Sequence, residues 1–118
     1  MDKTPGFATL DTEEAARAIA DGGHVVVDVR EPNELAASGK IPGAVNIPLG
    51  QLAVALDPAD PQHEPRLTDG TPLLFYCAAG GRSAKAADLA VANGVSDVSH
   101  IAGGFGAWRR TGGASEPV

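Results

Sequence analysis

The sequence predicts a single α/β domain, residues 1–118, with a central, mostly parallel sheet and helices on both faces. The segment His24–Val29 is rich in valine, which is typical of a central parallel strand covered on both sides. The apolar run Leu73–Cys77 predicts a second buried strand. Segments of helix-forming composition alternate with the strands, and this alternation favours parallel strands joined by helical crossovers.

The first helix is expected directly after a short strand at residues 7–9. Asp11 and Glu14 have the spacing of a capping box, residues 15–20 continue a helix, and Gly22 and Gly23 end it. The valine-rich strand follows.

Pro32 ends the regular pairing of that strand, and a short helix is expected over Asn33–Ala37, closed by Gly39. Residues 41–48 predict a turn into a short strand, and Gly50–Leu56 a short packed helix. The acidic, proline-rich segment Asp57–Pro65 is expected to form the most mobile loop.

The second half of the chain repeats the alternation. A helix is expected over Ala84–Asn93, stopped by Gly94, and a strand within Val95–Ile101. A glycine turn then leads into a last helix, Phe105–Arg110, with Trp108 as a packing anchor. The core is expected over residues 7–110, and residues 111–118 are expected to be a flexible, frayed tail.

The net charge of −6 and the absence of a lysine or arginine cluster beyond the pair Arg109–Arg110 argue against nucleic acid or an anionic membrane as a partner. One cysteine excludes an intrachain disulfide and suits a reducing compartment. The first residues contain no apolar signal region, and no stretch has the length of a bilayer span. The expected location is the cytoplasm.

The only cysteine, Cys77, lies between the end of a strand and the start of a helix. Gly80 and Gly81 allow a tight loop there, with at least one of them at positive φ. The loop amides, the helix dipole and the Arg82 guanidinium predict an anion-binding concavity and an easily ionised thiol. The alternative interpretation is that Cys77 is a small buried residue with no chemistry.

Three motifs resemble the rhodanese sulfurtransferase family. Cys77, Gly80, Arg82 and Ser83 are similar to its Cys-x-x-Gly-x-Arg-Ser active-site loop. The other two motifs are Asp28–Pro32 with Gly39 and Ile41–Pro48 at the N-terminal side, and Gly103–Phe105 with Trp108 at the C-terminal side. The resemblance runs from about Phe7 to Arg110 and implies a rhodanese-like sheet of about five strands. Lys40 departs from the pattern, since many relatives carry histidine there.

The resemblance implies that the Cys77 thiolate takes a sulfane sulfur from thiosulfate or another persulfide donor and passes it to cyanide or a thiol. The persulfide-binding loop would be Ala78, Ala79, Gly80, Gly81, Arg82 and Ser83. Asp28 and Arg30 would support it; Asp28 either orients a catalytic group or holds loops together, and the second role is favoured. The implied partners are small sulfur-containing anions and small thiols or a thiol-bearing acceptor protein. No cofactor or metal is expected, and the protein is expected to be a monomer or weak dimer.

Two other functions stay open. The first is a cysteine phosphatase or arsenate reductase of the same fold, although such loops place five residues between cysteine and arginine and this one has four. The second is a non-catalytic sulfur-relay module.

Arg82 is expected to pair with Asp28 or Glu31, and the 57–65 loop to flank the mouth of the site. The histidines at 24, 63 and 100 receive no catalytic role: His63 is expected in a solvated loop and His100 in a structural position.

Overall fold

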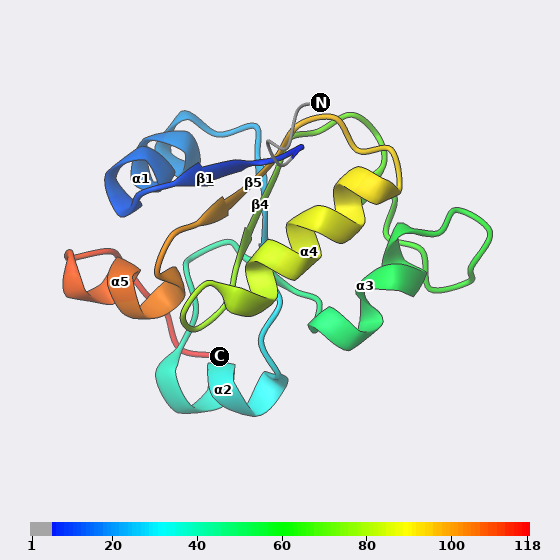
Figure 1. The fold of residues 1–118 in the computed structure, drawn as a ribbon. Coiled ribbons are helices and arrows are strands. Elements are labelled where there is room, and N and C mark those ends of the chain that lie inside the picture. The colour runs from blue at the N-terminus through cyan, green and yellow to red at the C-terminus, as the bar shows by residue number, and fades with distance from the viewer. Residues whose placement is uncertain (1–5) are drawn as a thin grey trace.

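The protein contains one five-stranded sheet in which every pairing is parallel (Figure 1). We describe residues 6–118 of a computed structural model. The strand order is β1-β5-β4-β2-β3. The strands are β1 (Ala8–Leu10), β2 (Val25–Asp28), β3 (Val45–Asn46), β4 (Leu73–Tyr76) and β5 (Val98–Ile101). The predicted α/β class, with a parallel sheet of about five strands, is confirmed.

Residues 6–118 form five α-helices, of which the first four lie between strands, because parallel neighbours need crossover connections, and the fifth follows the last strand. They are α1 (Thr12–Asp21), α2 (Pro32–Ser38), α3 (Leu49–Leu56), α4 (Gly81–Ala92) and α5 (Gly104–Arg110), with a 3₁₀ turn, η1, at Pro65–Leu67. The expected capping box begins α1: Glu14 N–H donates to Asp11, and Asp11 N–H donates to Glu14. None of the helices among residues 6–118 combines the length and apolarity that crossing a bilayer requires.

The sheet separates two apolar clusters. Leu73 and Phe75 of β4 face the cluster that includes α3 and α4, whereas Leu74 and Tyr76 face the one that includes α1 and α5. All four side chains have no exposed surface. β4 therefore runs through the centre of the core, and the residue that follows it, Cys77, leaves the sheet at its carboxyl edge.

The helix α4 begins earlier than its composition predicts. It starts at Gly81 instead of Ala84, because Gly80 takes a left-handed conformation (φ 113°) directly before it. Arg82 and Ser83 thus belong to the first helical turn. This difference matters for the site, since the free amides of a helix N-terminus now lie within the cysteine loop.

The end of the chain differs from the expected frayed tail. Lys40 and Glu116 exchange two backbone hydrogen bonds of 2.9 Å in an antiparallel bridge. The Lys40 ammonium lies 3.3 Å from the Glu116 carboxylate, and Trp108 Nε1 donates to Ala114 O. Lys40, the residue that departs from the family pattern, therefore contributes to holding the last residues against the domain.

The 57–64 loop lies away from the place expected for it. It forms successive turns, in which Asp60 N–H donates to Asp57 O and His63 N–H donates to Asp60 O. In Figure 1 it projects beyond α3, well separated from the loop that precedes α4. It therefore does not flank the mouth of the cysteine loop.

Candidate active site

The Cys77 loop lies at the carboxyl end of β4, between α2 and α5 in the view of Figure 1. In open α/β sheets this edge is where ligands bind. The prediction that at least one loop glycine has positive φ is confirmed by Gly80, whereas Gly81 is not among the positive-φ residues. The left-handed Gly80 turns the chain back toward the cysteine, and a β-branched residue is strongly disfavoured in that conformation.

Three polar groups surround the buried sulfur of Cys77. The amide N–H groups of Gly80 and Ser83 donate to Sγ over 3.1 and 3.3 Å, and the Ser83 hydroxyl oxygen lies 3.6 Å away, where it accepts from the thiol while donating to Gly80 O at 3.1 Å. Burial alone would raise the pKa of the Cys77 thiol. Hydrogen bonds from the Ser83 side chain and from the amides of Ser83, Gly80 and Ala79 outweigh burial and lower that pKa below its ordinary value. The loop therefore favours the thiolate.

The helix α5 holds the opposite side of the loop. Phe105 N–H donates to Cys77 O at 2.7 Å, and Gly106 N–H donates to Ala78 O at 3.0 Å. Gly104 lies so close that a Cβ there would be 2.4 Å from Cys77 O. The C-terminal glycine motif is therefore part of the site, because it binds the carbonyls of the cysteine loop.

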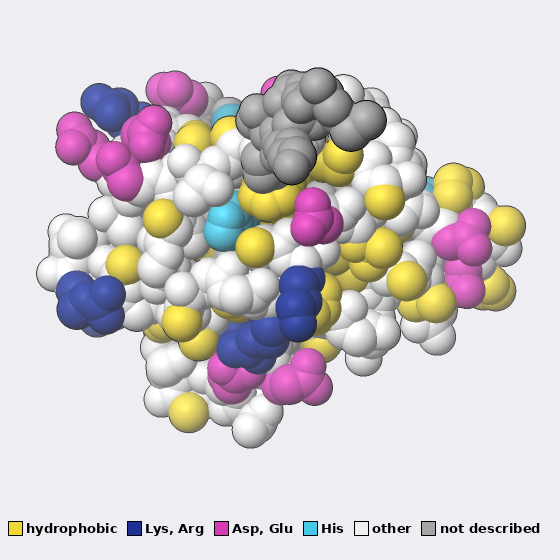
Figure 2. All heavy atoms as spheres, in the orientation of Figure 1, with side chains coloured by type: hydrophobic (Ala, Val, Ile, Leu, Met, Phe, Trp, Pro, Cys, Tyr) yellow, Lys and Arg dark blue, Asp and Glu magenta, His cyan; other side chains and the backbone are white. Residues whose placement is uncertain are grey.

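Arg82 pairs with Glu34 rather than with the expected Asp28 or Glu31. Its two terminal nitrogens lie 2.6 and 3.0 Å from the Glu34 carboxylate oxygens. This bidentate pair lowers the pKa of Glu34 to about 2. Figure 2 shows the result on the surface: basic side chains over the start of α4 adjoin acidic ones over α2. The cation nearest the site is therefore largely neutralised.

Asp28 and Arg30 lie beside the site as a buried ion pair. Arg30 donates to both Asp28 oxygens, to Ser38 Oγ and to Gly39 O. Its guanidinium also lies 4.4 Å from the centre of the Phe105 ring. These contacts tie β2 to the end of α2 and to α5, in keeping with the loop-holding role favoured for Asp28. Neither side chain has a hydrogen bond to Cys77 in the described structure.

The sequence reading missed two partners of the loop. Glu34 gives no local sign of its role, because its partner is far away in the chain. His100, for which a structural position is expected, has Nδ1 2.9 Å from Ser83 Oγ and Nε2 3.2 Å from Thr9 Oγ1. His100 is thus connected to Cys77 through one side chain, that of Ser83.

The other histidines lie away from the loop. His63 is half-buried instead of solvated: Nδ1 is 2.9 Å from Ala55 O, and Nε2 is 3.0 Å from Thr68 Oγ1. Nδ1 of His24 is buried and has no hydrogen-bond partner among residues 6–118. Within the described part of the chain, no three metal-binding side chains gather where they could hold an ion.

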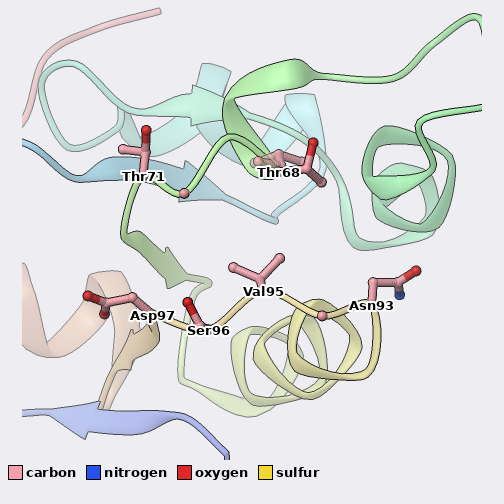
Figure 3. A pocket seen from close by; sticks show the side chains of 9 residues that line it. Thr68, Thr71, Asn93, Val95, Ser96 and Asp97 are labelled. Atoms are coloured by element: carbon pink, nitrogen blue, oxygen red, sulfur yellow. The ribbon is translucent and has the colours of Figure 1, made fainter.

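A hollow of about 200 Å³ lies at the opposite end of the sheet (Figure 3). Thr71, which precedes β4, and Asp97, which precedes β5, both line it. Cys77 follows β4, so the hollow and the thiol lie at opposite sheet edges. No cysteine or histidine lines the hollow.

Residues 11–111 match the rhodanese-like domain family. The chain is 36% identical to human thiosulfate:glutathione sulfurtransferase over 110 residues, covering 87% of this chain and 94% of that protein. It is 41% identical to mouse thiosulfate sulfurtransferase/rhodanese-like domain-containing protein 3, over 71% of this chain but only 57% of that longer protein.

The comparison with solved structures gives a similar result. A structure of a protein of unknown function from Rhodopseudomonas palustris, described as a possible tyrosine phosphatase, has a TM-score of 0.87 and 41% identity, covering 93% of this chain and 85% of that one. A rhodanese-like domain protein from Staphylococcus aureus has a TM-score of 0.76 and 28% identity, covering 95% and 99%.

Proposed function

Because the chain belongs to the rhodanese-like domain family, we propose that it is a sulfurtransferase that carries sulfur as a persulfide on Cys77. The observation that supports this most directly is the set of polar groups around Sγ: two backbone amides donate to it, the Ser83 hydroxyl lies beside it, and hydrogen bonds with these groups lower the pKa of the thiol. A lowered pKa increases the fraction of thiolate, which is the nucleophile.

In the first half-reaction, the Cys77 thiolate attacks the outer sulfur of a sulfane donor. A new sulfur–sulfur bond forms, the donor's sulfur–sulfur bond breaks, and the leaving group, sulfite in the case of thiosulfate, departs with the electron pair. The first hydrogen bond within α4 runs from Ala84 N to Gly80 O, so the amides of Gly81 and Arg82 precede it. These amides are the groups that would hold the negative terminal sulfur.

In the second half-reaction, an external nucleophile must remove the sulfur. Cys77 is the only cysteine, so the persulfide has no second thiol in the chain with which to form a disulfide. We propose cyanide, a small thiol or a thiol on another protein as the acceptor. The names of the human relative and of thiosulfate sulfurtransferase GlpE from Pseudomonas syringae, 36% identical over 83% of this chain and 84% of that protein, support thiosulfate as a donor.

The phosphatase alternative has weaker support here. A phosphoryl group is bound best by a guanidinium that offers two parallel N–H groups. Arg82 already directs its two terminal nitrogens to Glu34, and the loop places four residues between Cys77 and Arg82. The same loop, with its amides aimed at Sγ, suits a single bound sulfur atom.

Intact-protein mass spectrometry after incubation with thiosulfate tests the proposal. We expect the wild-type protein to gain the mass of one sulfur atom, to keep it after small molecules are removed, and to lose it on addition of cyanide or a thiol. Cys77→Ser serves as the control and should gain nothing. Release of phosphate from an aryl phosphate without any sulfur uptake would instead support the phosphatase function. If the protein showed neither reaction, that result would favour the non-catalytic module.

A further inference from the structure

Four side chains form a continuous path from the buried thiol to the protein surface. Cys77 Sγ lies 3.6 Å from Ser83 Oγ, which lies 2.9 Å from His100 Nδ1. His100 Nε2 lies 3.2 Å from the hydroxyl of Thr9, an exposed residue of the edge strand β1. Both ring nitrogens of His100 therefore have hydroxyl partners, one toward Cys77 and one toward solvent.

The fold brings these four groups together from four segments: the loop after β4, α4, β5 and β1. β5 lies between β4 and β1, and in its register His100 is paired with Phe75 on one side and Thr9 on the other. Ser83 reaches the ring from the first turn of α4, which exists only because that helix starts at Gly81. The path is thus a product of the tertiary structure and not of one local motif.

Among residues 6–118, the recorded contacts of the His100 side chain are with uncharged groups. The ring contacts Phe7 edge-on, with centroids 5.4 Å apart. Burial is the cause that lowers the pKa of His100, without a contribution from any carboxylate or cation in the described residues. Among these residues, the titratable group on the side of the ring that faces α4 is Cys77, which His100 contacts through Ser83. The residues paired with His100 on the neighbouring strands are Thr9 of β1 and Phe75 of β4, and both are uncharged.

We infer that His100 accepts the Cys77 proton through Ser83 when the thiolate forms, and so acts as a positioning and relay residue. The Cys77 S–H bond breaks and its proton passes to Ser83 Oγ, while the Ser83 O–H proton passes to His100 Nδ1. Sulfur keeps the electron pair, Ser83 keeps a hydroxyl, and His100, with Nε2–H donating to Thr9, becomes imidazolium. Loss of the Nε2 proton to solvent at Thr9 then leaves a neutral ring with its proton on Nδ1.

The final arrangement favours the thiolate. With the proton on Nδ1, His100 donates to Ser83 Oγ. The Ser83 hydroxyl, which donates to Gly80 O at 3.1 Å in this structure, then turns its proton to the sulfur anion. In the thiol state the direction of both hydrogen bonds is reversed. The purpose of this relay, to prepare the nucleophile for a sulfane donor, rests on the proposed function, but the ionisation itself takes place without substrate.

The first test measures the thiolate by its ultraviolet absorbance as the pH is raised. Since Cys77 is the only cysteine, the signal reports one group. His100→Asn keeps an amide oxygen that can accept from Ser83 but cannot take up a proton. We expect this variant to raise the pKa of Cys77 by about one unit, equivalent to about tenfold less thiolate below that pKa. The matched control is His63→Asn, which removes a histidine bound to a hydroxyl elsewhere, and it should leave the titration unchanged.

The second test needs no substitution of His100. Imidazole ¹⁵N resonances distinguish the two neutral tautomers, and we expect those of His100 to change from the Nε2–H to the Nδ1–H form as Cys77 ionises. Coupling between two sites is reciprocal, so this step should be absent in Cys77→Ser.

Either of two results would overturn the relay: a folded His100→Asn protein with the wild-type Cys77 titration, or His100 resonances that do not respond to Cys77. If His100→Asn fails to fold, the resonance test still decides. If His100 responds to Cys77 but the protein takes up no sulfur, the proposed sulfurtransferase function is rejected and the relay is retained.

Discussion

The contact between α5 and the cysteine loop makes a quantitative prediction for Gly104→Ala. Gly104 has φ of 60°, and an added Cβ would lie 2.4 Å from Cys77 O and 2.8 Å from Ala78 O. Both atoms belong to the backbone, so the clash cannot be relieved by turning a side chain. We expect the loop to move away from α5.

The expected loss has two parts. A left-handed conformation costs a residue other than glycine about 1–2 kcal/mol. The displaced loop also loses the hydrogen bonds from Phe105 N–H and Gly106 N–H, each worth about 1 kcal/mol. The free energy of unfolding should therefore fall by about 3–4 kcal/mol, and the pKa of Cys77 should rise because the amides that face Sγ move with the loop.

Denaturant unfolding measures the first effect and alkylation of Cys77 against pH measures the second. The matched control is Gly112→Ala, which also has positive φ (91°) but whose Cβ would meet no atom within 4 Å. It should lose about 1–2 kcal/mol and leave Cys77 unaffected. If both variants lost the same stability and reacted alike, contact of α5 with the loop would not be what shapes the site.

Three further predictions concern the loop and its ion pair. Cys77→Ser should abolish sulfur uptake in the mass-spectrometric assay with little change in the thermal midpoint, because the side chains are nearly isosteric. Gly80→Val should lower sulfur uptake far more than Ala79→Val does, since only Gly80 has positive φ; equal losses would point to crowding instead. Arg82 lowers the pKa of Glu34 from 4.5 to about 2, so the pair contributes stability that is present above pH 4.5 and is lost as the pH falls toward 2. The stability difference between wild type and Glu34→Gln should shrink over that range in denaturant titrations, and a constant difference would contradict the ion pair.

Local patterns in the sequence were sufficient for the elements of the fold. The capping box at Asp11 and the valine-rich run at residues 24–29 act within a few residues, so the helix and strand they predict are present. The start of α4 was misplaced because composition disfavours glycine in helices, whereas the left-handed Gly80 lets the helix begin at its neighbour.

The partners of the site depend on contacts between distant parts of the chain. Arg82 binds Glu34, and Lys40 pairs with Glu116, because the sheet order brings their elements together. No pattern within a short window distinguishes Glu34 from Glu31 as the partner of Arg82. The same holds for His100. Side chains alternate between the two faces of a strand, so the sequence allows the His100 side chain to lie on either face of the sheet, and only the position of α4 shows which face meets Ser83.

The C-terminal glycine motif and the cysteine loop act through the same peptide group. Ala78 O is held by Gly106 N–H of α5, and the N–H of that peptide belongs to Ala79. In a trans peptide the carbonyl and the N–H point in opposite directions. Fixing the carbonyl toward α5 therefore turns the Ala79 N–H toward the thiol, where it helps to lower the pKa of Cys77. Within the described structure, the helix that closes the fold thus contributes to the ionisation of Cys77 without a hydrogen bond to its sulfur. The motif around Gly104 is as much a part of the anion-binding loop as the glycines that follow the cysteine.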